Sequence, residues 1–171
     1  INHASWKIFS KHKERLTKLS HRGPDKIDFY VDPNKQIFMG HTRLCIQGNL
    51  TGTQPIKYTC KDDSTSYLCA NAEIYNAAEI LETNDFETDC LAVSKALDKN
   101  CFVFFPTTSR LSMLDGIFSF VHYHNNKVTV ARSVCGVMNL YYANTHSDDG
   151  CETVYFSSER KAACNLDFKP F

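Results

Sequence analysis

The feature that most constrains this chain is the separation of strand-like segments from helical ones. Its last third contains four segments rich in β-branched and aromatic residues, namely GIFSFVHYH (116–124), KVTVARS (127–133), MNLYYA (138–143) and ETVYFSS (152–158). An Asn125-Asn126 pair and an Asp-Asp-Gly turn separate neighbouring segments, as is typical of hairpins. Strands that follow one another in this way favour an α+β fold with antiparallel sheets over alternating βαβ units.

The N-terminal part of the chain reads as a helix followed by a hairpin. The apolar residues Trp6, Phe9, Leu16 and Leu19 are three or seven positions apart, as on one face of a helix, which predicts an amphipathic helix over residues 5–19. The Gly-Pro pair in HRGPD cannot continue this helix. IDFYV (27–31) and QIFMGHTRLCI (36–46) then flank a DPNK turn, so we expect them to pair as a hairpin.

The middle of the chain contains one more strand and two helices. SYLCA (66–70) predicts a strand that ends at Asn71, where the chain turns towards an Ala/Glu-rich segment. AAEILE and TDCLAVSKALD are predicted helices, with Thr88 or Asp89 as the N-cap of the second. A short helix over SERKAACN is expected near the C-terminus.

Length and charge restrict the classes of partner. The 171 residues have the size of one domain. Lys plus Arg and Asp plus Glu balance at 19 each, so no net charge attracts nucleic acid or an anionic membrane. No apolar stretch approaches the roughly 20 residues of a membrane helix, and the start is unlike a signal peptide. We therefore expect no nucleic-acid partner, no membrane insertion and a cytoplasmic location, with an organelle as the alternative.

The eight cysteines permit either a disulfide framework or reduced thiols. None of them has CxxC spacing, which argues against a zinc knuckle. A chain of this size has an adequate core without disulfides, so we expect reduced, structural cysteines. Cys69, Cys90 and Cys135 stand in apolar stretches, where a free Cys behaves as a small hydrophobe.

Metal and nucleotide motifs are weak in this sequence. His122 and His124 share one face of a predicted strand and could seed a metal site, but no third ligand is evident beside them. Neither GxxxxGK(S/T) nor GxGxxG occurs, so nucleotide-phosphate binding has no support. We expect no metal ion and no other cofactor.

Three polar residues interrupt apolar segments, and each has two interpretations. Arg43 lies in a strand-like run, either on a solvated edge or as a bidentate partner of a carboxylate. Asn71 follows a strand, either in an Asx-turn or with the next backbone N–H as an oxyanion hole. Asp89 caps a helix or holds an ammonium group. Together the three would suit an α-amino acid with a side-chain carbonyl.

The order and spacing of seven segments resemble the class II glutamine amidotransferase domain of glutamine-hydrolysing asparagine synthetase. The resemblance covers about residues 15–165 and rests on HRGPD (21–25), HTRL (41–44), GTQPI (52–56), NAEIYN (71–76), TDC (88–90), MLDGIFSF (113–120) and SSERKA (157–162). It implies the N-terminal-nucleophile hydrolase fold, a four-layer αββα sandwich of two antiparallel sheets. Residues 1–171 would then be a single amidotransferase-like domain without its first strand and without a synthetase domain.

The resemblance also implies a substrate and site residues. Members of the family hydrolyse L-glutamine to glutamate and release ammonia for a synthetase domain. By position, Arg43 would hold the α-carboxylate, with Leu44 to Gln47 lining the pocket. Asn71 and the backbone N–H of Ala72 would form the oxyanion hole. Glu73 and Asp89 would face the polar groups of the substrate, and Asp89 would hold the α-ammonium.

The chain departs from the family pattern at several positions. The family nucleophile is an N-terminal Cys whose own α-amine is the base, whereas this chain begins at Ile1. The Gly of the oxyanion corner is Ala72, which would cost about 1 kcal/mol if the corner required positive φ. Leu91, Ser133 and Asn139 stand where the family has a Glu, an Asp and a Pro.

These departures leave two hypotheses open. In the first, the chain is a glutaminase domain whose Cys-bearing first strand stands ahead of Ile1, with a synthetase domain as its partner. In the second, it is a catalytically inactive relative that keeps the fold as a structural or interaction subunit of a larger complex. A Met-Cys-Gly-Ile start just upstream would favour the first hypothesis.

Overall fold

The computed structural model describes residues 3–32, 34, 37–44, 52–98, 101, 107–146, 150 and 152–171. The helices are α1 (His3–Thr17), α2 (Ala77–Leu81), α3 (Leu91–Leu97), α4 (Thr107–Leu111) and the 3₁₀ helix η1 (Arg160–Ala163). The strands are β1 (Lys26–Asp32), β2 (Ile37–Arg43), β3 (Ile56–Thr59), β4 (Thr65–Ile74), β5 (Gly116–His124), β6 (Lys127–Arg132), β7 (Tyr141–His146), β8 (Glu152–Ser157) and β9 (Lys169–Pro170). No helix in these ranges combines the length and apolar character needed to cross a bilayer.

All pairings between the described strands are antiparallel, as the run of hairpins predicts. β1 and β2 form a two-stranded sheet, and β3-β4-β5-β6 form a four-stranded sheet. β8-β7-β9 form a third sheet. The β5–β6 turn has positive φ at both Asn125 and Asn126, the backbone of the type I′ turn that suits a tight hairpin.

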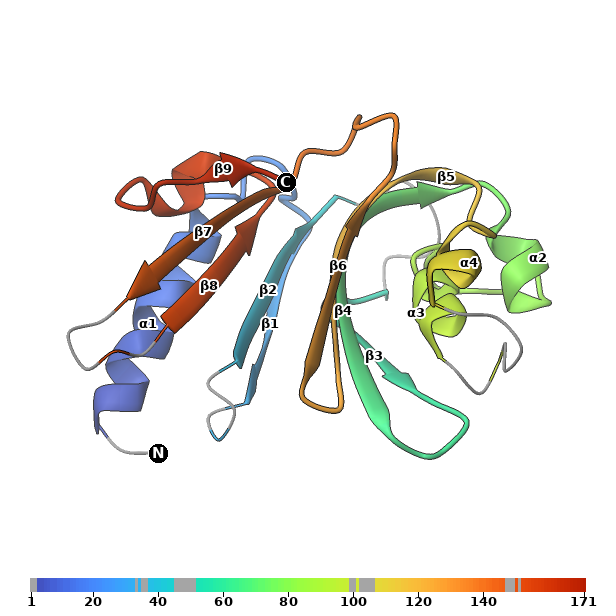
Figure 1. The fold of residues 1–171 in the computed structure, drawn as a ribbon, viewed down its shortest axis with the longest axis horizontal. Coiled ribbons are helices and arrows are strands. Elements are labelled where there is room, and N and C mark those ends of the chain that lie inside the picture. Colours follow the sequence, from blue (N-terminus) through green and yellow to red (C-terminus); the bar gives the residue numbers. More distant parts are fainter. Residues whose placement is uncertain are drawn as a thin grey trace.

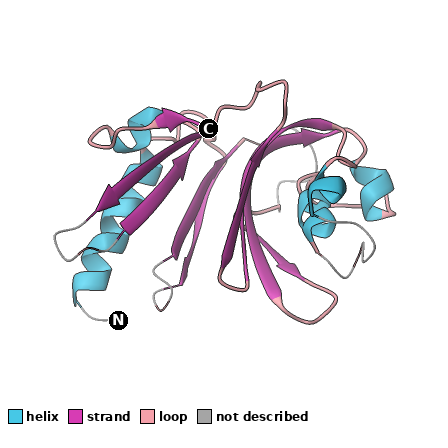
Figure 2. Ribbon diagram, viewed as in Figure 1, coloured by secondary structure: helices cyan, strands magenta, loops and turns pink. Residues whose placement is uncertain are grey.

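The elements stack as four layers, helix on sheet on sheet on helix (Figure 1; Figure 2). α1 and η1 form one outer layer, and α2, α3 and α4 form the other. α1 covers both smaller sheets, because its His12 ring lies 5.3 Å from Phe38 of β2 and 5.9 Å from Tyr155 of β8 between ring centroids. The predicted αββα sandwich is therefore confirmed, with the layer beneath α1 divided into two sheets.

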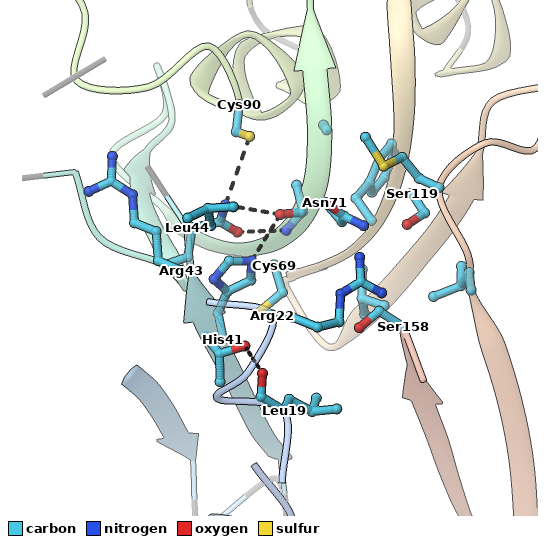
Figure 3. A pocket seen from close by; sticks show the side chains of 18 of the residues that line it. Leu19, Arg22, His41, Arg43, Leu44, Cys69, Asn71, Cys90, Ser119 and Ser158 are labelled. Atoms are coloured by element: carbon cyan, nitrogen blue, oxygen red, sulfur yellow. Dashed lines mark hydrogen bonds between the residues drawn. The ribbon is translucent and has the colours of Figure 1, made fainter. Parts of the chain in front are cut away.

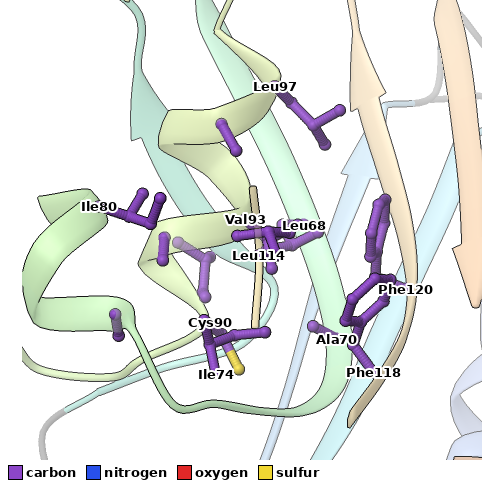
Figure 4. Packing of buried hydrophobic residues seen from close by; sticks show 14 residues of the cluster. Leu68, Ala70, Ile74, Ile80, Cys90, Val93, Leu97, Leu114, Phe118 and Phe120 are labelled. Carbon is purple, nitrogen blue, oxygen red and sulfur yellow. The ribbon is translucent and has the colours of Figure 1, made fainter. Parts of the chain in front are cut away.

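The two sheet layers meet face to face, and the main core lies on the far side of the four-stranded sheet. Tyr30 of β1 stacks on Tyr67 of β4 with 3.6 Å between ring centroids. The helices α2 and α3 cover β4 and β5 on the opposite face (Figure 4). The most deeply buried residues of this core are Leu68, Ile74, Ala92, Val93, Ala96 and Phe120.

Several predicted elements are confirmed, and the limits of two strands need correction. The first helix, the β1–β2 hairpin, β5, β6 and β8 occur where the sequence predicts them. The strand containing SYLCA does not end at Asn71; β4 continues to Ile74, because β5 pairs with it throughout. MNLYYA is only partly a strand, since β7 begins at Tyr141. β3, α4 and β9 were not predicted from the sequence.

The predicted N-cap of the second helix is wrong. α3 begins at Leu91, its N-cap residue is Cys90, and no side chain caps the helix. The Asp89 carboxylate instead accepts a hydrogen bond from the Ile74 backbone N–H at 2.7 Å. The long-range bond to β4 has replaced the local bond that the sequence pattern favours.

Candidate active site

The fold brings the separated sequence motifs together. Asp25 of HRGPD donates its backbone N–H to the Arg43 carbonyl at 3.1 Å. Gly23 passes so close to HTRL that an added Cβ would lie 2.2 Å from the Thr42 carbonyl carbon. The Glu159 carboxylate of SSERKA contacts the first two residues of HRGPD, His21 at 3.3 Å and Arg22 at 3.4 Å. Three motifs from distant parts of the chain thus meet at one end of the sandwich.

A second junction joins NAEIYN to MLDGIFSF. The Asn76 side chain accepts the Asp115 backbone N–H and donates to the Met113 carbonyl, both at 2.9 Å. The Tyr75 N–H donates to the Asp115 carbonyl at 2.8 Å. Gly116 lies against β4, where an added Cβ would meet the Glu73 carbonyl oxygen at 2.2 Å. These contacts fix the end of β4 against the start of β5.

A cavity of about 360 Å³ lies between the sheet layers, next to these junctions. Its walls come from β2, β4, β5, β8, the start of α3 and the segments after α1 and β6 (Figure 3). Of the residues predicted for the site, Arg43, Asn71, Ala72, Glu73 and Asp89 all line this cavity. Gln47 lies outside the described residues.

One edge of β4 is open at the cavity. β3 pairs with β4 only as far as Leu68. Beyond this point side chains replace the missing strand: Gln54 accepts from the Ala70 N–H at 2.7 Å and donates to the Ala70 carbonyl at 2.9 Å. Asp89 takes the Ile74 N–H in the same way. Alternate N–H groups of a strand point to the same edge, so the Ala72 N–H points between these two contacts.

The register of the sheet agrees with this direction. Ala72 lies opposite Phe118 of β5, whose backbone N–H and C=O bond to Ser133 on the other side. Phe118 therefore cannot bond to Ala72. Within the described part of the chain, nothing accepts a hydrogen bond from the Ala72 N–H. Ala72 is not among the described non-glycine residues with positive φ. The backbone strain that a left-handed conformation would impose on an alanine is therefore absent at this position.

Asn71 supplies a second donor beside Ala72. Its Nδ2 is buried and, among the described residues, has no hydrogen-bond partner. A buried amide nitrogen without a partner costs about 1–3 kcal/mol, so this arrangement is unfavourable unless a ligand accepts the bond. Asn71 and Ala72 together present two N–H groups to the cavity.

Arg43 ends β2 and is only 7% exposed. Its guanidinium donates to the Gly52 carbonyl, and Gly52 approaches so closely that an added Cβ would lie 3.1 Å from the Arg43 Nη2. The side chain extends away from Asn71 (Figure 3). The solvated-edge interpretation of Arg43 is thus wrong, because the side chain is buried.

Asp89 and Glu73 lie at the end of the cavity where β4 stops. Asp89 is 4% exposed, and its Oδ1 accepts from the Thr88 hydroxyl at 3.3 Å. Glu73 is half-buried and precedes Ile74, whose N–H Asp89 holds. Two carboxylates and one guanidinium therefore line the same cavity as the Asn71 and Ala72 donors.

The cavity is also lined by residues that the sequence did not single out as site residues, among them Gln54, Arg22 and His41. Gln54 holds the edge of β4, and Arg22 extends into the cavity on the side of Ser158 (Figure 3). His41 donates its Nε2–H to the Ala70 carbonyl at 3.1 Å, while its Nδ1 is buried without a described partner. Burial, and then the nearby arginines, lower the pKa of His41 to about 4, so the ring is neutral. HRGPD and HTRL contain two of these residues.

The cavity contains two thiols, and both are protonated. Burial raises the pKa of Cys69 to about 12, and burial together with Asp89 raises that of Cys90 to about 12. The six described cysteines are free thiols, which confirms the reduced state for them. Cys135 is exposed, contrary to the prediction of a buried hydrophobe, because it lies in the loop after β6 and not in a strand.

Comparison with known sequences identifies the family. The family described as "Glutamine amidotransferase domain" matches residues 3–170. The chain therefore belongs to the glutamine amidotransferase domain family.

Individual relatives are asparagine synthetases. The probable glutamine-hydrolyzing asparagine synthetase of Schizosaccharomyces pombe is 35% identical over 153 residues, covering 85% of this chain and 25% of the relative. The glutamine-hydrolyzing asparagine synthetase of Gallus gallus is 35% identical over 152 residues, covering 87% and 26%. The Bacillus subtilis asparagine synthetase 1 is 30% identical over 174 residues, covering 91% and 25%. The chain thus spans about a quarter of the length of these relatives.

Solved structures show the same fold. The glutamine phosphoribosylpyrophosphate amidotransferase of B. subtilis, complexed with ADP and GMP, superposes with a TM-score of 0.67 at 17% identity, covering 91% of this chain and 41% of that one. An allosteric regulatory enzyme of purine biosynthesis superposes with a TM-score of 0.57 at 20% identity, covering 77% and 30%. These likenesses support the N-terminal-nucleophile hydrolase sandwich.

Proposed function

We propose that this chain is the glutamine-binding domain of an amidotransferase that hydrolyses L-glutamine to glutamate and ammonia. The observation that carries the proposal is the pair of donors without a described partner, Asn71 Nδ2 and Ala72 N–H, at the open edge of β4. In acyl transfer, negative charge develops on the carbonyl oxygen of the substrate. Two fixed N–H groups beside a buried cavity are suited to stabilise that charge.

The remaining predicted residues suit the other end of glutamine. Arg43 would bind the α-carboxylate, since the planar fork of a guanidinium suits the two oxygens of a carboxylate. The substrate amide and its carboxylate lie at opposite ends of the molecule, which agrees with the separation of Arg43 from Asn71 (Figure 3).

Asp89 and Glu73 would bind the α-ammonium. The two bonds that the Asp89 carboxylate accepts leave further lone pairs, because an ionised carboxylate offers about four acceptor positions. Gln47, which lies outside the described residues, keeps its proposed place beside Arg43.

On this proposal the nucleophile is a Cys ahead of Ile1 in the complete protein. The reaction needs a thiol and a free α-amine on one residue. Cys69 and Cys90 do not meet this need, because both thiols are buried, protonated and within the chain. Attack by the thiolate on the glutamine carbonyl would form a thioester and release ammonia, and water would then release glutamate. The ammonia would pass to a synthetase domain, on this chain or on a partner protein.

A second candidate function is that of an inactive subunit that keeps the fold and the pocket for assembly within a complex. The observation that favours it is that both described thiols in the cavity have raised pKa values. Ser133, which replaces a family Asp, here joins β6 to β5 through the Phe118 backbone and also contacts the loop residues Cys135 and Gly136.

One experiment separates the two functions. The complete protein is incubated with L-glutamine, and ammonia is measured before and after treatment with a thiol alkylator. The amidotransferase proposal expects ammonia release that alkylation abolishes and that Asn71→Ala lowers by about 10²–10³-fold. D-Glutamine is the matched substrate control. Glutamine binding without any ammonia release would contradict the catalytic proposal and favour the inactive subunit.

A further inference from the structure

A cluster of metal-ligating side chains lies at the opposite end of β4 from the glutamine pocket. Cys60, Asp62 and His124 each offer one ligand atom, and these three atoms all lie within 4.8 Å of one another. Cys60 is buried, His124 is half-buried and Asp62 is exposed. The cluster therefore borders solvent on one side and the protein interior on the other.

The hairpin between β3 and β4 holds two of the three ligands in place. The Cys60 N–H donates to the Ser64 carbonyl at 2.8 Å, and the Asp63 N–H donates to the Cys60 carbonyl at 3.0 Å. Asp63 has a φ of 63°, which gives the turn its tight left-handed residue. The Lys61 N–H donates to the Asp98 carboxylate at 2.9 Å, which fixes the turn to the end of α3.

The third ligand comes from the end of β5. The register places His124 opposite Ser66 of β4, directly beside the hairpin. The Ser64 hydroxyl bonds to the Asp62 carboxylate and lies 2.7 Å from His124 Nε2. Since Ser64 donates its proton to Asp62, the Nε2–H of His124 donates to Ser64. This hydroxyl holds Asp62 and His124 close together in the metal-free protein.

The distance between Cys60 and His124 fits a small tetrahedral ion. Cys60 Sγ and His124 Nε2 are 3.8 Å apart. If an ion lay about 2.3 Å from the sulfur and about 2.0 Å from the nitrogen, the sulfur–ion–nitrogen angle would be roughly 120°, close to the tetrahedral angle. One thiolate, one imidazole and one carboxylate form a ligand set that suits zinc and disfavours magnesium or calcium, which prefer oxygen ligands.

We propose that Cys60, Asp62 and His124 form a binding site for a divalent transition-metal ion, with Zn²⁺ as the best-fitting ion. The ion would replace the thiol proton of Cys60 and bind Nε2 of His124, whose ring proton would move from Nε2 to Nδ1. Its fourth position would be left to water or an external ligand. It would join the β3–β4 hairpin to the end of β5. His122, which shares a strand face with His124, is not one of the three clustered residues. The partners of His124 come from the β3–β4 turn and not from its own strand.

The site is separate from the glutamine pocket and does not rest on the proposed function. Ser66, opposite His124, precedes Asn71 by five residues along β4, which is about 17 Å at the usual strand rise. Figure 1 shows the β3–β4 turn at the lower end of the sheet, away from the junction of β4 with α2. Metal binding can therefore be tested whether or not glutamine is hydrolysed.

Cobalt(II) and zinc(II) titrations of the reduced full chain test the proposal. Co²⁺ is the spectroscopic probe, because a thiolate-to-cobalt charge-transfer band reports the sulfur ligand and intense visible bands report tetrahedral geometry. We expect one equivalent of Co²⁺ to produce both signals and one equivalent of Zn²⁺ to remove them. We also expect Zn²⁺ to raise the thermal unfolding temperature, since it binds the folded state.

Variants assign the signal to the cluster. Cys60→Ser and His124→Gln should weaken Zn²⁺ binding by at least about 100-fold, more than the loss of an outer-shell contact. Asp62→Asn changes only an exposed turn residue, so it keeps the fold and should weaken binding less but measurably. Cys164→Ser and His146→Gln, exposed residues outside the cluster, are the matched controls and should bind as the parent chain does.

Two outcomes would overturn the proposal. One is the absence of a charge-transfer band in the parent chain, which would leave the cluster as a hydrogen-bond network centred on Ser64. The other is unchanged binding in both Cys60→Ser and Asp62→Asn, which would place the metal on other cysteines. Far-ultraviolet circular dichroism of each variant excludes unfolding as the cause of lost binding.

Discussion

The two halves of β4 differ in how their outer edge is paired. From Ser66 to Leu68 the strand lies between β3 and β5, and the Leu68 side chain is completely buried. From Cys69 to Ile74 only β5 continues, and the side chains of Gln54 and Asp89 take the place of β3. The difference shows that the pocket arises where a neighbouring strand stops. The paired half is covered by a strand on each side, and the open half leaves the Asn71 and Ala72 donors without a described partner.

Truncation in the paired half should have the largest effect on stability. Leu68→Ala removes a fully buried side chain from the core between β4 and α3, so we expect a loss of about 2–5 kcal/mol in the free energy of unfolding. Denaturant unfolding measures this loss. Asn71→Ala in the open half is the matched comparison and should be neutral or slightly stabilising, since it removes an unpaired buried donor. Equal losses in the two variants would contradict the division of β4.

Acid should weaken the open half through His41. Its pKa in the folded protein is about 4, below the ordinary 6.5, because burial opposes protonation. Above pH 6.5 the His41 ring is neutral in both the folded and the unfolded chain, so His41 does not lower the free energy of unfolding there. Between pH 6.5 and 4 only the unfolded chain gains the proton, so stability falls, by at most on the order of 3 kcal/mol.

Unfolding free energies measured at intervals from pH 8 to 4 test this dependence. His41→Gln removes the titrating ring, so its stability should fall less steeply than that of the parent chain across the same range. Parallel profiles for the two proteins would show that His41 is not the group responsible.

Removing the side chain that replaces β3 should have an intermediate effect. Gln54→Leu leaves the Ala70 N–H without its acceptor and the Ala70 carbonyl with His41 as its side-chain donor, which should cost about 1–3 kcal/mol. Hydrogen exchange followed by NMR should accelerate at Ala70. Exchange at Leu68, next to β3, is the internal control and should change much less. Uniform acceleration along β4 would mean that Gln54 stabilises the whole sheet instead.

The smallest expected effect concerns Ala72. The residue belongs to a strand and is not among those with positive φ, so a glycine gains no conformational advantage there. Ala72→Gly should therefore destabilise the protein by about 0.5–1 kcal/mol through the entropy of the unfolded chain. Thermal unfolding measures the change. A stabilising effect would indicate that this corner does favour a left-handed backbone.

The sequence predicted the local elements better than their limits. The β1–β2 and β5–β6 hairpins could be predicted, because alternating apolar residues and turn residues specify them within a short span. The end of β4 could not, because Asn71 resembles a turn residue until nine consecutive residues of β5 are known to pair alongside. The prediction that Cys135 is buried was wrong for a similar reason. Apolar neighbours in the sequence do not bury a residue that lies in an exposed loop.

The sequence by itself determined the family, the antiparallel α+β architecture and most of the residue types at the pocket, since these follow from motif order and periodicity. The tertiary structure alone decided which polar groups are already occupied. It assigned Asp89 to the Ile74 N–H, left the donors of Asn71 and Ala72 open, and gathered Cys60 and Asp62 beside His124. Hydrogen-bond partners and metal ligands come from residues far apart in the chain, so only the packed sheets bring them within reach.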